Sequence, residues 1–250
     1  MELTVQLILL FFVVAMVAGC VDAIAGGGGL ITIPVLLAAG LPPALAIATN
    51  KLGGVAGTFS ATMHFVRIGE IKLNRIFYLV PPTFLGAVLG GFALTKIDGS
   101  FLALLVPFLL VGFSTYFLFS PNIGTLDKKQ KLSLVVFGLT MAPLIGFYDG
   151  FFGPGTGTFF CLAFTLLLGF NIVKATAHAK LLNLASNFSA LLFFILHGSI
   201  LWNVGIVMML GQFIGGYLGA RLVVKNGTKL IKGIMVVVAV ALSVKMVMYR

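Results

Sequence analysis

Two aspartates, Asp22 and Asp149, lie inside long apolar runs, and each is followed four residues later by a glycine-rich break. The first run reads GCVDAIAGGGGLITIPVLLAAG and the second reads GFYDGFFGPGTGTFFCLAFTLLLG. A carboxylate inside a lipid bilayer is costly, and such a residue usually marks a functional site. Because the aspartates hold equivalent places in the two halves, they predict a transporter built from repeats, with its site where the repeats meet.

The composition is that of a membrane protein. Hydrophobic residues make up 60% of the chain and charged residues 9%, whereas about 25% of the residues of a soluble domain are charged. At about 20 residues each, roughly eight to ten apolar segments fit into the chain. The 31 glycines suit closely packed transmembrane helices. We therefore expect an all-α polytopic protein that lies in the lipid bilayer.

The formal net charge of +10 does not predict a nucleic-acid partner. The basic residues lie mostly in short loops, as the positive-inside rule expects, and no basic helix or aromatic-basic surface accompanies them. Cys20 and Cys161 lack CxxC spacing, which favours two packed thiols over a disulfide or a metal site. The VAGC that ends at Cys20 resembles a lipoprotein cleavage box. No Lys or Arg precedes it, so we expect an uncleaved first helix.

The first half divides into five apolar segments, at 3–25, 30–40, 44–66, 76–94 and 100–119. The glycine run ends the first segment, and Leu41-Pro42-Pro43 ends the second, because proline cannot continue a helix. The second segment is too short to span a bilayer alone. The first two segments therefore form either two crossings or a re-entrant hairpin.

The second half repeats the pattern of the first. At one fixed offset Gly19, Asp22, Gly26 and Gly28 match Gly146, Asp149, Gly153 and Gly155. After a slip of two residues, Lys51, Asn74, Gly86, Gly90 and Lys96 match Lys180, Asn203, Gly215, Gly219 and Lys225. Asp, Asn and Lys are rare here, so their matches count most. We predict a membrane repeat at 1–119, a cytoplasmic linker at 120–131 and a second repeat at 132–250.

The loop charges indicate that the repeats are inverted. The loop RIGEIKLNR is basic, whereas its counterpart HGSILWN has no Lys or Arg; conversely, the counterpart of TKIDGS, a loop expected at 221–232, is strongly basic. Such a swap is expected if the halves have opposite orientations. Both termini then face outside. The cytoplasmic side holds Arg67, Lys72, Arg75, Lys128, Lys129, Lys131, Lys174, Arg221, Lys225, Lys229 and Lys232. A plain eight-helix arrangement would instead make the repeats parallel.

The glycine breaks are candidate anion sites. A break inside the bilayer frees backbone groups, which is tolerated only where they are buried in protein or line a wet cavity. The half-helices that follow would point their N-termini, with partial positive charge, at that cavity. The candidate residues are Gly26, Gly27, Gly28, Gly29, Gly153, Gly155, Thr156, Gly157 and Thr158. A tight helix crossing that needs small residues is the alternative. No Gly-Lys-Ser/Thr follows, which excludes a nucleotide P-loop.

Lys51 and Lys180 each lie about two turns into a helix, where the pair could bind an anion from two sides. Snorkelling to the headgroups is the alternative. Asp22 and Asp149 are expected to be counter-ions of these lysines, proton or cation carriers, or helix caps. Further candidates on the lysine helices are Thr49, Asn50, His178, Asn183 and Asn187. No second histidine stands at ligand spacing, so we expect no metal and no cofactor.

The sequence resembles the sulfite exporter TauE/SafE family of bacterial membrane permeases over nearly its whole length. The resemblance rests on GGGGLITIPVLLAAGLPPALAIATNKL and on GFYDGFFGPGTGTFFCLAFTLLLGFNIVKATAHAKLLNLASNFSA. It implies a multi-pass transporter of the bacterial cytoplasmic membrane for sulfite, sulfonates or related organosulfur anions. It also implies that the glycine motifs of both halves face one site, and it carries over residues 26–29, 49–51, 149, 153–158 and 178–180.

The leading hypothesis is a secondary transporter that works by alternating access, with the anion between Lys51 and Lys180. An intramembrane enzyme is disfavoured, because the chain has no GxSxG, no HExxH and no closely spaced carboxylate pair. A channel or a cation- or proton-coupled carrier that uses Asp22 and Asp149 is the remaining alternative. The sequence has no ATP-binding motif, so a gradient of protons or another ion, or a partner, would supply the energy. It leaves the oligomeric state open.

Overall fold

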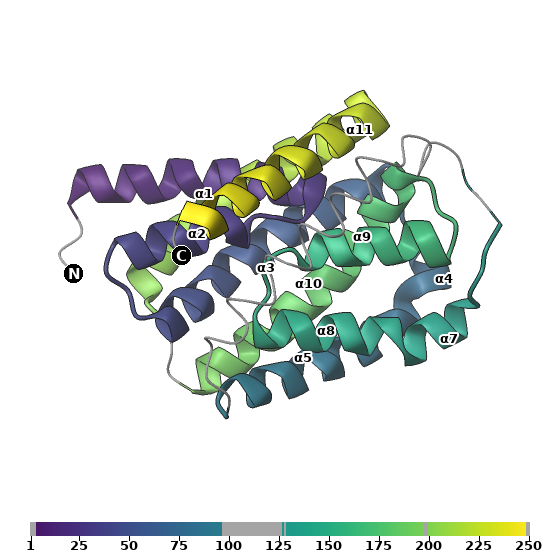
Figure 1. The fold of residues 1–250 in the computed structure, drawn as a ribbon, viewed down its shortest axis with the longest axis horizontal. Coiled ribbons are helices and arrows are strands. Elements are labelled where there is room, and N and C mark those ends of the chain that lie inside the picture. The colour runs from purple at the N-terminus through teal and green to yellow at the C-terminus, as the bar shows by residue number, and fades with distance from the viewer. Residues whose placement is uncertain (1–3, 97–126, 128, 198–199, 249–250) are drawn as a thin grey trace.

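The computed structural model describes residues 4–96, 127, 129–197 and 200–248, and all regular structure within them is helical (Figure 1). The predicted segment at 100–119 and most of the linker at 120–131 lie outside the described residues. The elements are α1 (Val5–Ala25), α2 (Gly29–Ala38), α3 (Pro43–Arg67), α4 (Leu73–Ile76), η1 (Phe77–Leu79), α5 (Val80–Leu94), α7 (Leu134–Leu139), α8 (Met141–Phe151), α9 (Thr156–Leu167), α10 (Ile172–Leu196) and α11 (Trp202–Met248).

Five stretches of the described chain are long and apolar enough to cross a membrane: Val5–Ala25, Leu73–Leu94, Leu134–Phe151, Ile172–Leu196 and Trp202–Gly227. The helices α2 and α9 are apolar but too short, at 10 and 12 residues. The 25-residue helix α3 is long enough, but it is less apolar and is not among the five. The described residues therefore hold five of the eight to ten membrane segments that the sequence predicts, and α2, α3 and α9 are not among those five.

Both predicted glycine breaks interrupt the helices. Gly26 ends α1 with a φ of 79° and donates its N–H to the carbonyl of Asp22, 2.7 Å away. Gly153 and Gly155 separate α8 from α9 with φ values of 94° and 86°. These positive values are easy only for glycine, which has no Cβ to clash with the backbone. The chain therefore reverses direction inside the bundle at both breaks.

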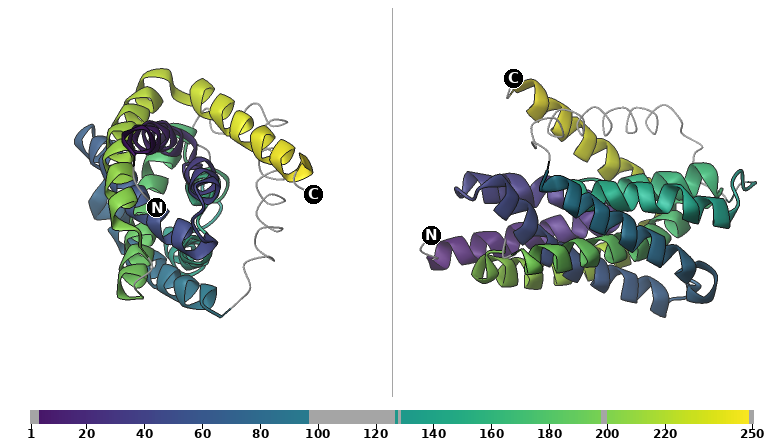
Figure 2. Two further views of the ribbon diagram at one scale, coloured as in Figure 1. Left: turned by 90° about the vertical axis from the view of Figure 1, so that its left-hand side faces the viewer. Right: turned by 90° about the horizontal axis from the view of Figure 1, so that it is seen from below.

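The loop predicted at 221–232 is wrong. This stretch is helical, and α11 continues through it with a single kink at Gly227, where φ is 59° and ψ is −144°. One glycine in a positive-φ conformation redirects the helix, so no connecting loop is needed. Figure 2 shows the part of α11 after the kink, in yellow, running back along the outside of the bundle.

The helices of the two predicted repeats pack crosswise. α1 packs along α11, and α5 packs along α8, while α3 and α10 contact each other at the centre. In Figure 1, α2 turns back toward the end of the bundle where α1 begins. α9 turns back toward the opposite end, where α7 begins. Two short hairpins therefore enter the bundle from opposite ends, and their glycine breaks reach its middle.

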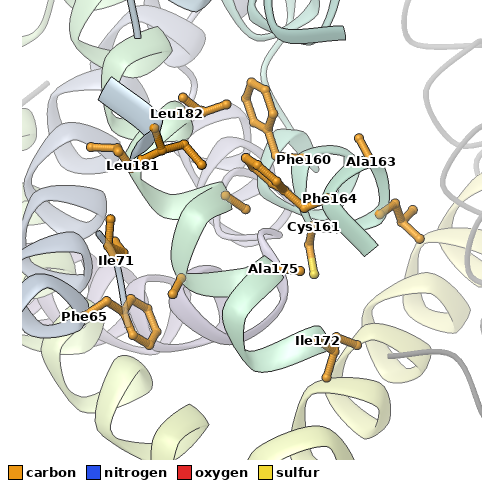
Figure 3. Close-up of a cluster of buried hydrophobic side chains, with 14 of the residues drawn as sticks. Phe65, Ile71, Phe160, Cys161, Ala163, Phe164, Ile172, Ala175, Leu181 and Leu182 are labelled. Atoms are coloured by element: carbon orange, nitrogen blue, oxygen red, sulfur yellow. The ribbon is translucent and has the colours of Figure 1, made fainter. Parts of the chain in front are cut away.

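Aromatic packing holds the half-helix α9 in place. Phe160 and Phe164 of α9 are fully buried against α10, in a cluster that extends on the other side of α10 to Phe65 of α3 (Figure 3). The ring of Phe164 stacks on Phe137 with their centroids 5.0 Å apart. Side chains of this size contribute a large share of core packing. The position of the glycine break before α9 is therefore fixed by the hydrophobic cluster that follows it.

Close crossings depend on glycines at matched positions. A Cβ on Gly86 or Gly90 of α5 would overlap the carbonyl oxygen of Pro143 or Phe147 of α8. A Cβ on Gly215 or Gly219 of α11 would likewise overlap the carbonyl oxygen of Met16 or Cys20 of α1. Met16 matches Pro143 and Cys20 matches Phe147, at the same offset that relates Asp22 to Asp149. The two crossings are therefore built in the same way, as expected for small residues at membrane helix contacts.

Replacement of Gly86 by valine should destabilise the protein by at least about 2 kcal/mol, because the added side chain must displace a backbone carbonyl. The midpoint of thermal unfolding in detergent measures the loss. Gly233→Val is the matched control, since nothing lies within 4 Å of a Cβ there. The control should stay within about 2 °C of the wild type. An equal loss in both variants would contradict the close crossing of α5 and α8.

Candidate functional site

The two glycine breaks meet in the middle of the bundle. A Cβ on Gly26 would overlap the backbone of Gly157 and Thr158, and the Thr158 hydroxyl donates to the carbonyl of Ala25. On the other side, an added Cβ on Gly29 would lie 3.6 Å from the Cα of Pro154. The absence of side chains allows this backbone-to-backbone contact. The beginnings of α2 and α9 are thereby brought to one place.

Lys51 of α3 forms a buried ion pair with Asp149 of α8. Its ammonium nitrogen lies 2.8 Å from Asp149 Oδ1, and only 2% and 1% of the two side chains are exposed. The same nitrogen also donates to the Asp149 carbonyl at 2.7 Å and to Asn187 Oδ1 at 3.1 Å. Because a lysine ammonium has three hydrogens, each of them has an acceptor here. The Thr156 hydroxyl also donates a hydrogen bond to Asp149 Oδ1, at 2.8 Å.

Lys180 of α10 forms the second ion pair, with Asp22 of α1. Its nitrogen lies 2.9 Å from Asp22 Oδ2, and the exposed fractions of the side chains are 1% and 16%. The other carboxylate oxygen, Oδ1, accepts the backbone N–H of Gly28 at 3.1 Å. That N–H belongs to the beginning of α2, where a negative charge is favourable. Asp22 therefore acts both as a counter-ion and as a cap of the half-helix that follows it.

Each ion pair joins one predicted repeat to the other. The structure gives both aspartates the counter-ion geometry that the sequence left as one of several alternatives. Snorkelling is contradicted, because both lysines are buried. In the bundle interior an isolated charge would be strongly unfavourable, and pairing reduces this cost. The four charges therefore hold α3 to α8 and α10 to α1 in the middle of the molecule.

A small cavity lies between the breaks and the ion pairs. Its volume is about 20 Å³, which is room for about one water molecule. Ten of the predicted site residues line it: Asp22, Gly26, Gly29, Asn50, Lys51, Asp149, Gly153, Gly155, Asn183 and Asn187. Most of these are polar or are glycines that expose backbone. The cavity therefore offers hydrogen-bonding groups inside an otherwise apolar protein.

Several predicted residues lie beside the cavity rather than on its wall. Thr49 accepts the N–H of Leu201 at 3.1 Å, which ties α3 to the start of α11. The ring of His178 lies between Phe164 and Phe170, and its Nδ1 is 2.7 Å from the Lys174 carbonyl. The remaining residues outside the lining are Gly27, Gly28, Thr156, Gly157, Thr158 and Lys180. All of these six except Gly27 contact the aspartates or the opposite break.

The sequence prediction missed two residues of the cavity wall, Gly54 and Gln212. Gln212 of α11 is 2% exposed, and its amide nitrogen has no hydrogen-bond partner within the described residues. Gly53 and Gly57 of α3 make room for it, since a Cβ on Gly53 would lie 2.6 Å from that nitrogen. A lone amide inside an apolar run, opposite a Gly-xxx-Gly pair, is the signal that could have identified this residue.

The cavity wall does not resemble a metal centre. In the part of the chain that the structure describes, no three His, Cys, Asp or Glu side chains come together. The groups at this place are instead two buried ammonium groups, the buried carboxylate of Asp149, the partly exposed carboxylate of Asp22 and several amides. Such a set can hold a small polar solute through hydrogen bonds and charge.

Lys51→Met and Asp149→Asn should each destabilise the protein by about 3–5 kcal/mol, because each leaves an uncompensated buried charge. The double variant should recover most of this loss, since it removes both charges. Lys180→Met should cost less, because its partner Asp22 is 16% exposed. Thermal unfolding of the four variants in detergent gives the coupling energy directly. Additive losses for Lys51 and Asp149 would contradict the pair.

Comparison with known proteins identifies the family. The model of the family described as "Sulfite exporter TauE/SafE" matches residues 11–246. A "Probable membrane transporter protein" of Haemophilus influenzae is 46% identical over 247 residues, which cover 99% of this chain and 97% of the relative. "Probable membrane transporter protein YfcA" of Escherichia coli K12 is 46% identical over 235 residues, with 94% and 87% covered.

A more distant relative, "Probable membrane transporter protein YunE" of Bacillus subtilis, is 22% identical over 262 residues, which cover 94% of this chain and 95% of the relative. No solved structure matches the chain. The resemblance seen in the two glycine motifs is confirmed by a family match that includes both of them. The relatives are named as membrane transporters, and the described residues include five helices able to cross a membrane. The chain is therefore a multi-pass membrane protein that belongs to the sulfite exporter TauE/SafE family.

Proposed function

We propose that this protein is a secondary transporter of small sulfur-containing anions, such as sulfite, sulfonates or related organosulfur acids, in the bacterial cytoplasmic membrane. The description of the family supports the substrate class. One observation carries the proposal: two helix breaks meet at a polar cavity that is lined by the buried Lys51 and by Asp22, the partner of the buried Lys180. Lysine ammonium groups and free backbone N–H groups are the ligands that an oxyanion prefers.

The donors available to an anion are not equally engaged. Lys51 has acceptors for all three of its ammonium hydrogens, whereas Lys180 has only Asp22 within the described residues. The Gln212 amide nitrogen lacks a partner and belongs to the same cavity wall. Asn50 and Asn183 add further amides. An oxyanion would therefore bind beside Lys180 and complete its hydrogen bonds with these amides, while Lys51 acts mainly as a positive charge.

Transport would proceed by alternating access between two inverted repeats, at 1–119 and 132–250, joined by the linker at 120–131. The hairpins that enter from opposite ends of the bundle support the inversion (Figure 1). The crosswise ion pairs and the matched glycine crossings support the repeat. A cavity with room for about one water is too small for a sulfur oxyanion. This conformation would therefore be a closed one, and loading the site would require the halves to move apart.

A channel or a simple cation carrier fits the site less well. Both aspartates already have a lysine at hydrogen-bond distance, so a bare cation would meet a carboxylate whose charge is compensated. The cavity also has room for only about one water, and its described lining has no row of carboxylates that a cation could follow. Cation selectivity usually comes from rings of carbonyls or carboxylates along a pore. Anion transport is therefore the better-supported function.

The transport proposal predicts uptake or efflux of at least one anion from a panel of sulfite, methanesulfonate and thiosulfate in proteoliposomes. Lys180→Ala and Lys51→Ala should each lower the initial rate by at least about tenfold, because the site loses a positive charge. Lys72→Ala, at an exposed loop lysine, is the control and should transport normally. If both site variants transport like the control, the anion site is placed wrongly.

The inverted arrangement predicts the sides on which two matched residues lie. Asn74 lies in α4, in the connection after α3, and Asn203 lies in the first turn of α11; both are exposed. Single cysteines at these positions, in a chain without Cys20 and Cys161, should react with an impermeant thiol reagent from opposite faces of the membrane. The basic loop that holds Asn74 should be cytoplasmic. Labelling of both cysteines from the same face would contradict inversion and support parallel repeats.

A further inference from the structure

The charges around the cavity already sum to zero, so an incoming anion would make the site negative. Lys51 and Lys180 are balanced by Asp149 and Asp22, so the site is neutral before any solute arrives. An anion that enters alone gives the interior a net negative charge, which is strongly unfavourable away from water. A proton that enters with a monovalent anion keeps the site neutral. One of the two aspartates would have to accept that proton.

The two ion pairs differ in how firmly the aspartate is held. Asp149 is 1% exposed, and it contacts Lys51 and the Thr156 hydroxyl. Asp22, which lines the cavity as Asp149 does, is 16% exposed and has one lysine contact and one backbone N–H. Each carboxylate has two donors, but Asp22 is the more exposed, and within the described residues its lysine has one acceptor where Lys51 has three. Asp22 is therefore the aspartate whose lysine an incoming anion can reach and take over.

The difference can be traced to residues at matched positions of the repeats. Asn187 gives Lys51 its third acceptor. The residue at the matched position of the first repeat is Thr58. The Thr58 hydroxyl donates to its own helix, with the Gly54 carbonyl 2.6 Å away, and leaves Lys180 without a matching acceptor. Thr156, which contacts Asp149, likewise stands opposite Gly29, which has no hydroxyl. The Asp22 pair thus lacks two polar contacts that the Asp149 pair has.

We propose that Asp22 carries the coupling proton of an electroneutral anion–proton symport, in which the anion takes the place of the Asp22 carboxylate at Lys180. This inference rests on the proposed function. The anion binds Lys180 as the proton binds the Asp22 carboxylate, and the charge of the site stays zero. When the anion leaves, Asp22 releases the proton on the same side and pairs with Lys180 again.

Other ionisable groups near Asp22 do not provide an equivalent proton acceptor. Lys180 of α10 is its partner, and Cys161 of α9 is fully buried beside that lysine. α2 has no ionisable side chain, and α3 and α8 contribute Lys51 and Asp149, which bind each other. α11 faces the cavity with the neutral Gln212, while its Tyr217 and Arg221 are exposed. On α1 itself Cys20 is the other ionisable side chain, and on α10 His178 and Lys174 contact each other away from the cavity.

Protonation of Asp22 also gives the anion a way to move the protein. The Asp22–Lys180 pair joins α1 of one repeat to α10 of the other. When the anion binds Lys180 and the proton binds Asp22, this link loses its charge attraction, while the Lys51–Asp149 pair stays intact. One connection between the halves is released only when both solutes are present. Coupling follows, because neither solute alone both keeps the site neutral and frees the link.

The test uses the full chain in sealed proteoliposomes, with radiolabelled methanesulfonate and sulfite as probes. Methanesulfonate stays a monoanion at all working pH values, so a proton that moves with it must travel on the protein. Exchange of the probe at equal pH on both sides measures anion transport alone. Accumulation driven by a gradient of one pH unit measures coupling. For the wild type we expect about tenfold accumulation on the alkaline side, with no effect of membrane potential.

Asp22→Asn should still exchange the probe, more slowly, but its accumulation ratio should fall to one, and its transport should become sensitive to membrane potential. Asp22→Glu should restore accumulation, and Glu70→Gln, in the loop after α3, is the control that should keep it. A trapped pH dye records proton entry in the wild type, independently of whether the variants fold.

The possible failures are distinguishable. Accumulation by Asp22→Asn equal to that of the wild type would overturn the carrier role. Net uptake of the probe by the wild type without proton entry would also overturn it, and would leave the proposed function standing. Failure of the wild type to exchange either probe would contradict the substrate class itself.

Discussion

The arrangement of the bundle depends on two crossed ion pairs in its interior. Lys51 and Lys180 lie where neither lipid nor bulk water can stabilise an ammonium group. Each finds its carboxylate on a helix of the other predicted repeat. The halves therefore cannot separate fully without leaving four charges unpaired in an apolar medium. An attraction of this kind fixes both the register of the helices and the identity of the partners, which non-directional apolar packing alone does not do.

The glycines make these ion pairs geometrically attainable. A carboxylate on α1 reaches a lysine on α10 only because the breaks let the backbones of the two hairpins touch, as Gly26 does with Gly157. Farther out, Gly86 and Gly215 bring the outer helices against carbonyl groups of the partner helices. Apolar surface provides little attraction between helices in lipid, so close backbone packing takes its place. The glycines thus set the distance between the helix backbones, and the buried charges determine which helices pair.

Much of this could be predicted from the repeated pattern of rare residues. Asp22 and Asp149, and likewise Lys51 and Lys180, stand at matched positions, and the structure brings all four together. The crosswise choice of partner could not be predicted, because spacing within a repeat says nothing about contacts between repeats. His178 illustrates a limit of inference by neighbourhood: it is close to Lys180 in sequence, yet its ring packs among aromatic side chains.

Other differences arise where one repeat departs from the other. Gln212 was missed because its matched residue is Thr83, whose hydroxyl donates to the Leu79 carbonyl of its own helix. The loop expected at 221–232 is a kinked helix because Gly227 alone supplies the change of direction. Residues that occur in only one repeat have no matched residue of the same type in the other, so the repeated pattern does not mark them.

Those departures matter for function, because two identical ion pairs would resist movement equally. An alternating-access protein needs one connection that a solute can break and another that holds the halves together while it does so. Lys51, with an acceptor for each ammonium hydrogen, suits the lasting connection, and Lys180, with one acceptor among the described residues, suits the breakable one. Asn187 and Thr156 strengthen the first pair, and Thr58 and Gly29 leave the second pair open. The repeats place two similar ion pairs between the halves, and a few polar residues without a match in the other repeat determine which of the two pairs the solute can break.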